Sequence, residues 1–234
     1  MTIKRLLIAN RGEIASRIIS SAHDMGISCV AIYTEADKDT PYVREADQAF
    51  KLSDSYLNSK EILDIALKSN SDAIHPGYGF LSENAAFANQ VKKLNIKWVG
   101  PSSNAIKKMG DKLTAKEIAI KANVPTLPMT SDPKKANSIG YPILVKAAAG
   151  GGGKGMRIVE KARDLKESIK AAEREAEGGF GDKRVFLERY IKRSRHIEIQ
   201  ILGDSFGNIV HLGERECSIQ RLSLIHISEP TRPS

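Results

Sequence analysis

The chain has 234 residues, 41% of them hydrophobic and 27% charged, a composition typical of a globular protein with one large or two ordinary domains. No apolar run is long enough to cross a bilayer or to act as a secretory signal, and two cysteines exclude a disulfide framework, so we expect a cytoplasmic protein, or one of an organelle matrix, without a membrane partner. The formal net charge of +8 suits an anionic partner, but basic residues are mixed with acidic ones and aromatic residues make up only 6%, which favours a solvated lysine-rich surface over a nucleic-acid-binding one.

Strands and helices are predicted to alternate through the first hundred residues. Apolar runs predict buried strands over residues 3–10, 28–34, 72–77 and 96–100. Helical periodicity between and after them predicts helices over residues 12–26, 59–70, 82–95 and 101–110. Ser59 is the predicted N-cap of the second helix, and Ser82 the predicted start of the third. Alternation at this spacing predicts an α/β fold with a doubly wound sheet.

The pattern changes in the second half of the chain. Helical sequence over residues 114–123 is followed by three prolines within residues 124–133, which we expect to mark a domain boundary. Strands are then predicted over residues 141–147, 156–160, 184–191, 195–204 and 206–214, with a helix over residues 162–177. In the strand from residue 195, isoleucines at 197, 199 and 201 alternate with polar residues, which predicts a half-buried antiparallel strand. The second half is therefore expected to be α+β.

A glycine-rich run, AAAGGGGKGM, separates two of these predicted strands. Gly150, Gly152 and Gly155 satisfy GxGxxG, but both flanks are strand-like, whereas a dinucleotide-binding loop leads from a strand into a helix. Walker A also fails, because Lys154 is followed by Gly155 rather than by Ser or Thr. A hairpin flap remains, whose N–H groups can contact phosphate oxygens and which can open and close over a ligand. The alternative is a flexible hairpin without a ligand.

Charged residues near the run strengthen the interpretation as a flap. Lys146 ends the strand before it and Lys112 lies in MGDK, and a lysine ammonium is a compact charge suited to phosphate. Glu188 occupies a strand position from which it can accept a hydrogen bond from an adenine amino group or a ribose hydroxyl. For each of the three the alternative is a solvated surface side chain. His75 follows a predicted strand, where either a ligand contact or a structural hydrogen bond is expected.

These pieces join in a resemblance that extends from residue 1 to residue 221. The segments that carry it occur in the order IANRGEIA, HPGYGFLSEN, MGDK, GYPILVKAAAGGGGKGMR, FLERYI, RHIEIQ and ERECSIQR. Together they resemble the N-terminal part of biotin carboxylases, the ATP-grasp component of acyl-CoA carboxylases and of pyruvate carboxylase. The resemblance implies a Rossmann-like pre-ATP-grasp domain over residues 1–112, an α+β ATP-grasp lid domain with the glycine flap over residues 113–191, and the start of a third, incomplete ATP-grasp domain over residues 192–221.

The resemblance also implies a reaction and its participants. The family uses ATP, Mg²⁺ and bicarbonate to form carboxyphosphate, and then carboxylates biotin held on a carrier protein or domain. The implied partners are that biotin carboxyl carrier and a carboxyltransferase subunit, with no nucleic acid and no membrane, and a homodimer is implied for the complete enzyme. The acyl-CoA or keto acid served stays open, although AAEREAEGGFGD resembles the propionyl- and methylcrotonyl-type subunits more than the acetyl-CoA type.

Site residues follow from the resemblance position by position. Lys112 and Lys146 are similar to the phosphate-contacting lysines, and Gly152 and Gly153 to the backbone clamp on the phosphates. The adenine-holding segment matches Glu188, Arg189, Tyr190 and Ile191. His196 matches a ribose contact, and Gln220 matches a further nucleotide-site residue. No catalytic residue and no metal ligand is assigned, because the family carries those groups at positions after the match ends.

The match stops abruptly after Arg221. The residues that follow, LSLIHISEPTRPS, carry two prolines and replace the basic run of the family, so residues 222–234 are predicted to be a non-native tail. A genuine divergent terminus is the alternative. We therefore expect an inactive or incomplete piece of an ATP-dependent ligase. The alternatives are another ATP-grasp ligase, such as a carbamoyl-phosphate synthetase-like enzyme, and a non-catalytic nucleotide-binding module.

Overall fold

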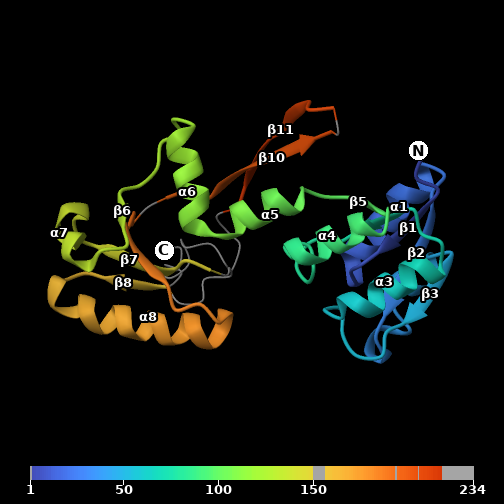
Figure 1. Cartoon of the computed structure of the whole chain (residues 1–234), viewed down its shortest axis with the longest axis horizontal. Helices are drawn as coiled ribbons and strands as arrows, with labels where there is room; N and C mark the ends of the chain where they lie inside the picture. Colours follow the sequence, from blue (N-terminus) through green and yellow to red (C-terminus); the bar gives the residue numbers. More distant parts are fainter. Residues whose placement is uncertain (1, 150–155, 193, 205, 218–234) are drawn as a thin grey trace, which may run out of the picture. The chain divides into compact units, whose positions relative to one another are not determined.

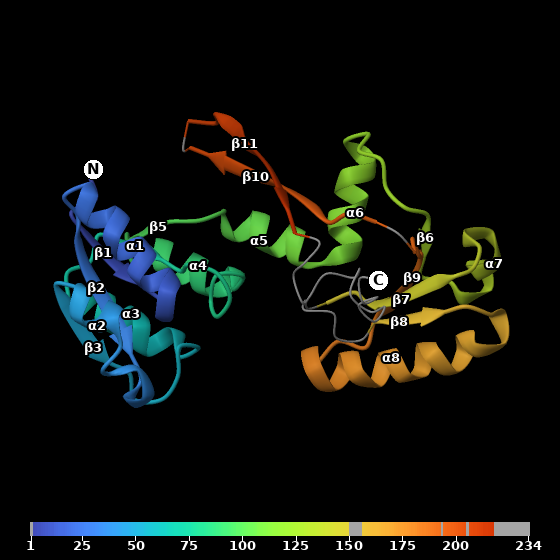
Figure 2. The ribbon, with the colours of Figure 1, turned by 180° about the vertical axis from the view of Figure 1, so that it is seen from behind.

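Two units make up the chain, residues 1–108 and residues 109–234, and each is described by itself (Figures 1 and 2). The computed structural model describes residues 2–149, 156–192, 194–204 and 206–217. Gly152, Gly153, Gln220 and the predicted tail lie outside this part of the chain. The domain boundaries at 112/113, 191/192 and 221/222 stay predictions. Within the described residues, no helix combines the length and apolar character that a membrane crossing requires.

The first unit is built on a five-stranded parallel sheet in the order β3-β2-β1-β4-β5. Its strands are β1 (Arg5–Ile8), β2 (Ser28–Tyr33), β3 (Gln48–Lys51), β4 (Ala73–His75) and β5 (Lys97–Trp98). Its helices are α1 (Gly12–Asp24), α2 (Pro41–Glu45), α3 (Ser59–Lys68), α4 (Ala85–Lys93) and the start of α5 (Ser103–Gly110), with a 3-10 turn η1 (Glu35–Asp37). The predicted α/β fold with a parallel sheet is confirmed.

Both faces of this sheet are covered. Leu6 and Ile8 of β1 pack with Ile19 of α1 and with Tyr42 of α2 on one face. Leu7, between them, points to the other face, where residues of α3 and α4 complete a second apolar cluster. Because successive side chains of a strand point to opposite faces, a strand covered on both faces reads as a continuous apolar run, which is why the sequence predicted it.

Two helix starts differ from the prediction. The N-cap of α3 is Asn58 rather than Ser59, and its side chain accepts a hydrogen bond from Glu61 N at 3.2 Å. Likewise α4 starts after Asn84, whose Oδ1 accepts from Phe87 N at 2.9 Å, and not at Ser82. Asn caps at least as well as Ser, so neighbouring polar residues compete for the cap position.

A buried carboxylate closes the carboxyl end of β2. Asp37 is 3% exposed and accepts from Arg11 Nε at 2.8 Å, from the Tyr56 hydroxyl at 2.6 Å and from Thr34 Oγ1 at 3.2 Å. The Tyr56 hydroxyl in turn lies 2.9 Å from that of Tyr42. The hydrogen bond from Arg11 holds the pKa of Asp37 below its ordinary value of 3.8, even though burial opposes this. The network therefore joins β1, β2 and the loop after β3.

The loop after β4 is held by the chain itself. Asn10 Nδ2 donates to Pro76 O at 2.7 Å and to Tyr78 O at 2.8 Å, and Gly77 N donates to His75 Nδ1 at 3.0 Å. Burial lowers the pKa of His75. Of the two roles expected for His75, the structure shows the structural hydrogen bond, at the point between β1 and β4 where doubly wound sheets often bind ligands.

Gly77→Ala is expected to destabilise the first unit by about 2 kcal/mol. Gly77 has a φ of +62°, and a Cβ atom there would lie 2.6 Å from Nδ2 of the buried Asn10. Gly79→Ala is the matched control, because Gly79 has a φ of +66° but open space around its missing Cβ. Urea denaturation of the two variants isolates the clash from the backbone strain. Equal losses of stability would show that Asn10 does not restrict this position.

The second unit contains a four-stranded antiparallel sheet in the order β6-β9-β7-β8. Its strands are β6 (Met129–Thr130), β7 (Ile143–Ala147), β8 (Arg157–Val159) and β9 (Val185–Arg189). Its helices are α6 (Lys112–Lys121), α7 (Ala136–Ile139) and α8 (Leu165–Phe180), with 3-10 turns η2 (Pro133–Lys135) and η3 (Ala162–Asp164). The proline-rich stretch, predicted to mark a domain boundary, instead supplies the edge strand β6, a place where flanking prolines are tolerated.

The remaining strands, β10 (Ile197–Gly203) and β11 (Ile209–Glu216), form an antiparallel hairpin with a sheet of its own. The predicted antiparallel pairing is confirmed, but the predicted half-burial is wrong. Ile197 is 41% exposed, and Ile199 and Ile201 are each 54% exposed. Alternation predicts a strand with one apolar face, but burial of that face requires a second layer, which the described residues do not supply.

Candidate nucleotide-binding site

Three charged side chains of the second unit meet on one face of its sheet. Glu188 lies on β9, between β6 and β7, and β7 pairs with it so that Leu144 is opposite Glu188 and Lys146 opposite Phe186. Because alternate residues share a face, Lys146 and Glu188 lie on the same side of the sheet. The other side is apolar and packs against α8 (Figure 1). The strand register thus places the two charged groups together.

The Glu188 carboxylate pairs with two ammonium groups at once. Lys146 Nζ lies 3.0 Å from Oε2, and Lys116 Nζ, from α6, contacts Oε1. The three side chains are only 11–15% exposed. Lys146 also lies over the Phe186 ring, 5.8 Å from its centroid. The alternative of solvated surface residues is therefore wrong for Lys146 and Glu188, which are largely removed from water.

The charges of this cluster favour the binding of an anionic ligand. Burial raises the pKa of Glu188, but the hydrogen bond from Lys116 and the charge of Lys146 outweigh it and hold the pKa below its usual value. Glu188 is thus ionised at neutral pH, and one carboxylate between two ammonium groups leaves a net charge of +1. A partly buried excess of positive charge attracts an anionic ligand more strongly than the same charge in water.

Lys112 is fixed beside the start of the glycine run. It is the first residue of α6, whose N-cap Asp111 accepts from Thr114 N at 2.8 Å and pairs with Arg184 at 2.9 Å. Lys112 N donates to Ala148 O at 3.2 Å, and its Nζ reaches Ala149 O at 3.5 Å. These contacts hold the lysine against the residues that lead directly into the run.

The segment after Glu188 is anchored through its backbone. Arg189 N donates to Pro128 O at 3.0 Å and Tyr190 N to Pro142 O at 3.1 Å. The Arg189 side chain donates to Ile139 O at 3.0 Å, so it is directed to the end of α7. Ile191 is 45% exposed. If Arg189 contacts a ligand bound at Glu188, it therefore does so through its main-chain atoms.

His196 immediately precedes β10, the strand that pairs with β11. Its carbonyl accepts from Cys217 N at 2.7 Å, and its ring lies 3.5 Å from the carboxylate of Glu198. The structure therefore pairs Lys146 with Glu188 on one face of the sheet and holds Lys112 at the carboxyl end of β7, whereas Tyr190 lies at the other end of that strand, against Pro142. It ties His196 to the hairpin.

Comparisons with known proteins decide the family. Residues 2–106 match the model of the biotin carboxylase N-terminal domain, and residues 103–229 match the model of the carbamoyl-phosphate synthase L chain ATP-binding domain. The chain belongs to the biotin carboxylase family. The resemblance inferred from the sequence is thereby confirmed.

The relatives of this biotin carboxylase family member extend beyond it. Biotin carboxylase 1 of Bacillus subtilis is 50% identical over 232 residues, an alignment that covers 94% of this chain and 52% of that protein. The structure of the Campylobacter jejuni biotin carboxylase–β,γ-ATP complex has a TM-score of 0.91 at 47% identity, over 94% of this chain and 52% of that one. That of the biotin carboxylase domain dimer of Hydrogenobacter thermophilus 2-oxoglutarate carboxylase, with MgADP, ADP and bicarbonate, has a TM-score of 0.90 at 44% identity, over 95% and 52%. The chain thus spans about half the length of these relatives.

One residue of the cluster, Lys116, was not predicted from the sequence. Lys116 follows Lys112 by four positions, a spacing that puts both side chains on one face of a helix. That spacing is a usable signal, because Lys112 is itself a predicted phosphate contact. Lys116, on the same helix face, is then a natural second candidate.

The residues present fit a nucleotide phosphate better than they fit Mg²⁺. Ammonium groups from Lys112, Lys116 and Lys146 are phosphate-binding groups. Mg²⁺ prefers oxygen ligands, whereas the carboxylate of Glu188 is already shared by two ammonium groups. These ammonium groups can therefore bind and orient the anionic part of a nucleotide.

Proposed function

We propose that this chain is the N-terminal part of an ATP-dependent ligase that carboxylates biotin on a carrier protein, using bicarbonate through carboxyphosphate. The observation that carries the proposal is the largely buried pairing of Glu188 with Lys146 and Lys116 on one face of the sheet. The family match and the nucleotide complexes of the similar structures support it.

Each residue of the proposed site has a binding role. Lys112 and Lys146, with the backbone of Gly152 and Gly153, contact the phosphates. Glu188 to Ile191 hold adenine, His196 the ribose, and Gln220 completes the nucleotide contacts. When bound, Mg²⁺ neutralises charge on the phosphates and helps to align them. The chain's own contribution is to hold the phosphates by fixed cationic groups, since phosphoryl transfer depends mainly on alignment and charge stabilisation.

The proposed organisation follows the family. Residues 1–112 form the Rossmann-like domain, residues 113–191 the ATP-grasp lid, and residues 192–221 the start of the third domain, with residues 222–234 foreign to the enzyme. A biotin carboxyl carrier and a carboxyltransferase are the proposed partners, which the carboxylase names of the relatives support. The dimeric Hydrogenobacter domain supports a homodimer for the complete enzyme.

The function is tested by measuring ADP release by an enzyme whose gene is completed to the length of its relatives. We expect release that depends on bicarbonate and rises when free biotin is added, because biotin accepts the carboxyl group. An enzyme that releases ADP without either requirement would contradict the proposal. A version ending at residue 234 is the matched control, and we expect it to show no carboxylation.

A carbamoyl-phosphate synthetase-like activity is the second candidate. Its support is the match of residues 103–229 to the ATP-binding domain of that synthase. The same assay separates the two, since ammonia rather than biotin would then stimulate ADP release. The carboxylase is favoured because the N-terminal unit matches a biotin carboxylase domain instead.

A further inference from the structure

Lys116 and Lys146 reach the same carboxylate independently. Lys116 comes from α6 and contacts Oε1 of Glu188, whereas Lys146 comes from β7 and contacts Oε2. Neither pairing uses the oxygen of the other. Each oxygen of Glu188 therefore has its own ammonium partner, and one partner can leave while the other stays.

The two lysines are not equally placed. Lys146 is followed by Ala147 and Ala148, which lead into the glycine run, and it is the lysine to which the proposed function gives a phosphate contact. Lys116 sits one turn along α6 from Lys112, whose backbone is bonded to Ala148. Lys116 therefore comes from a helix, and Lys146 is the partner that the proposed function assigns to the phosphates.

A buried carboxylate that loses all its partners is strongly destabilising, whereas one that keeps a partner is not. If Lys146 were the sole partner of Glu188, transfer of its ammonium to a phosphate would leave an unpaired buried charge. With Lys116 in place, Glu188 stays paired at 12% exposure when Lys146 turns to the ligand. The second lysine removes the obstacle to that transfer.

We propose that Lys116 is a positioning residue of the nucleotide site, which holds Glu188 and thereby frees Lys146 for the phosphates of a nucleoside triphosphate. The proposal rests on the proposed function. It concerns the phosphates only, so adenosine, which has none, is expected to bind independently of Lys116.

The sharing of Glu188 is tested by thermal unfolding of four variants of this chain. Lys116→Met and Lys146→Met are each expected to lower Tm slightly, because Glu188 keeps one partner. The double variant is expected to lower Tm by clearly more than the sum of the two, because both partners are gone. Adding Glu188→Gln to the double variant is expected to recover most of the loss. If the losses of Tm caused by Lys116→Met and Lys146→Met were simply additive, the inference about Lys116 would be wrong, and the proposed function would be unaffected.

The consequence for the ligand is tested by titration with MgATP and with adenosine to millimolar concentrations. Lys116→Met is expected to weaken MgATP binding about tenfold and to leave adenosine binding unchanged. Lys116→Arg, which keeps the charge, should bind as the wild type does. Because Glu188 is also proposed to hold adenine, the recovery is measured as the ratio of MgATP affinity to adenosine affinity. Lys116→Met should lower this ratio about tenfold, and Lys116→Met/Glu188→Gln should restore it, because no carboxylate then holds Lys146.

The outcomes separate the alternatives. If Lys116 contacted phosphate itself, the loss in Lys116→Met would persist when Glu188→Gln is added, and the inference would be wrong. Unchanged MgATP binding in Lys116→Met would also overturn it. A wild-type chain that binds neither MgATP nor adenosine would contradict the proposed function and this inference with it.

Discussion

Lys146→Met is expected to weaken the binding of MgATP to this chain about a hundredfold. The ammonium of Lys146 is 3.0 Å from Glu188 and only 15% exposed as a side chain, so its charge acts in a setting little screened by water. Methionine keeps much of the length of the stem over the Phe186 ring but removes the charge. Isothermal titration with MgATP measures the change in affinity directly.

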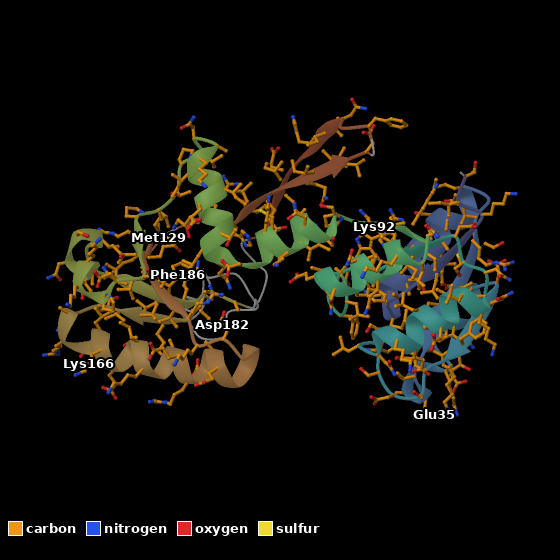
Figure 3. All side chains as sticks on the ribbon, viewed as in Figure 1. Glu35, Lys92, Met129, Lys166, Asp182 and Phe186 are labelled. Carbon is orange, nitrogen blue, oxygen red and sulfur yellow. The ribbon has the colours of Figure 1, made fainter. Side chains whose placement is uncertain are left out.

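The same substitution is expected to lower Tm by only about 2–4 °C. Glu188 keeps Lys116 as a partner in this variant, so no buried charge is left alone. Lys166→Met is the matched control, because Lys166 is an exposed residue of α8 (Figure 3) and its loss should change neither affinity nor Tm. If Lys146→Met bound MgATP as tightly as the wild type, Lys146 would not be a phosphate contact.

The sequence identified strands and helices wherever burial leaves a strong periodic signal. The continuous apolar runs of β1 and β2 were predicted because both their faces are covered. Strand β3 was not predicted, since it is a short edge strand, QAFK, in which only Phe50 is partly buried. Hydrogen bonding to β2 makes it a strand, and that pairing leaves little trace in its own residue types.

The candidate site was predictable as a set of residues but not as an arrangement. Lys146 and Glu188 were singled out separately, and no sequence pattern shows that they form an ion pair, because they are 42 positions apart. The strand register that puts them on one face follows from packing against α8, a long-range property. The ion pair of Lys116 with Glu188 was unpredictable for the same reason, since the two are 72 positions apart, although the spacing of Lys116 from Lys112 indicates a shared helix face.

Asp37→Ala is expected to destabilise the first unit by about 3 kcal/mol. This is near the lower end of the cost of breaking a buried ion pair, because the partner Arg11 is half-exposed. The substitution removes the acceptor shared by Arg11, Tyr56 and Thr34, and it leaves the Tyr56 hydroxyl, which donates to Asp37 at 2.6 Å, without that acceptor. Fluorescence of Trp98, the one tryptophan of the chain, reports unfolding of this unit, because it packs against Phe87 in its core. Asp39→Ala, at an exposed position two residues further on, should change stability by less than about 0.5 kcal/mol.

The effect of Asp37 should depend on pH in one direction. Its pKa in the folded protein lies below the ordinary value of 3.8, mainly because Arg11 donates to it, so the folded state binds this proton more weakly than the unfolded state does. The stability that Asp37 contributes is therefore fully present above pH 3.8 and is lost as the pH falls through the lower pKa of the folded state. The isosteric variant Asp37→Asn carries no such charge, so the gap in unfolding free energy between it and the wild type should narrow with acidification. A gap that stayed constant down to strongly acidic pH would mean that the ion pair with Arg11 contributes nothing, and that Asp37 acts only through shape and neutral hydrogen bonds.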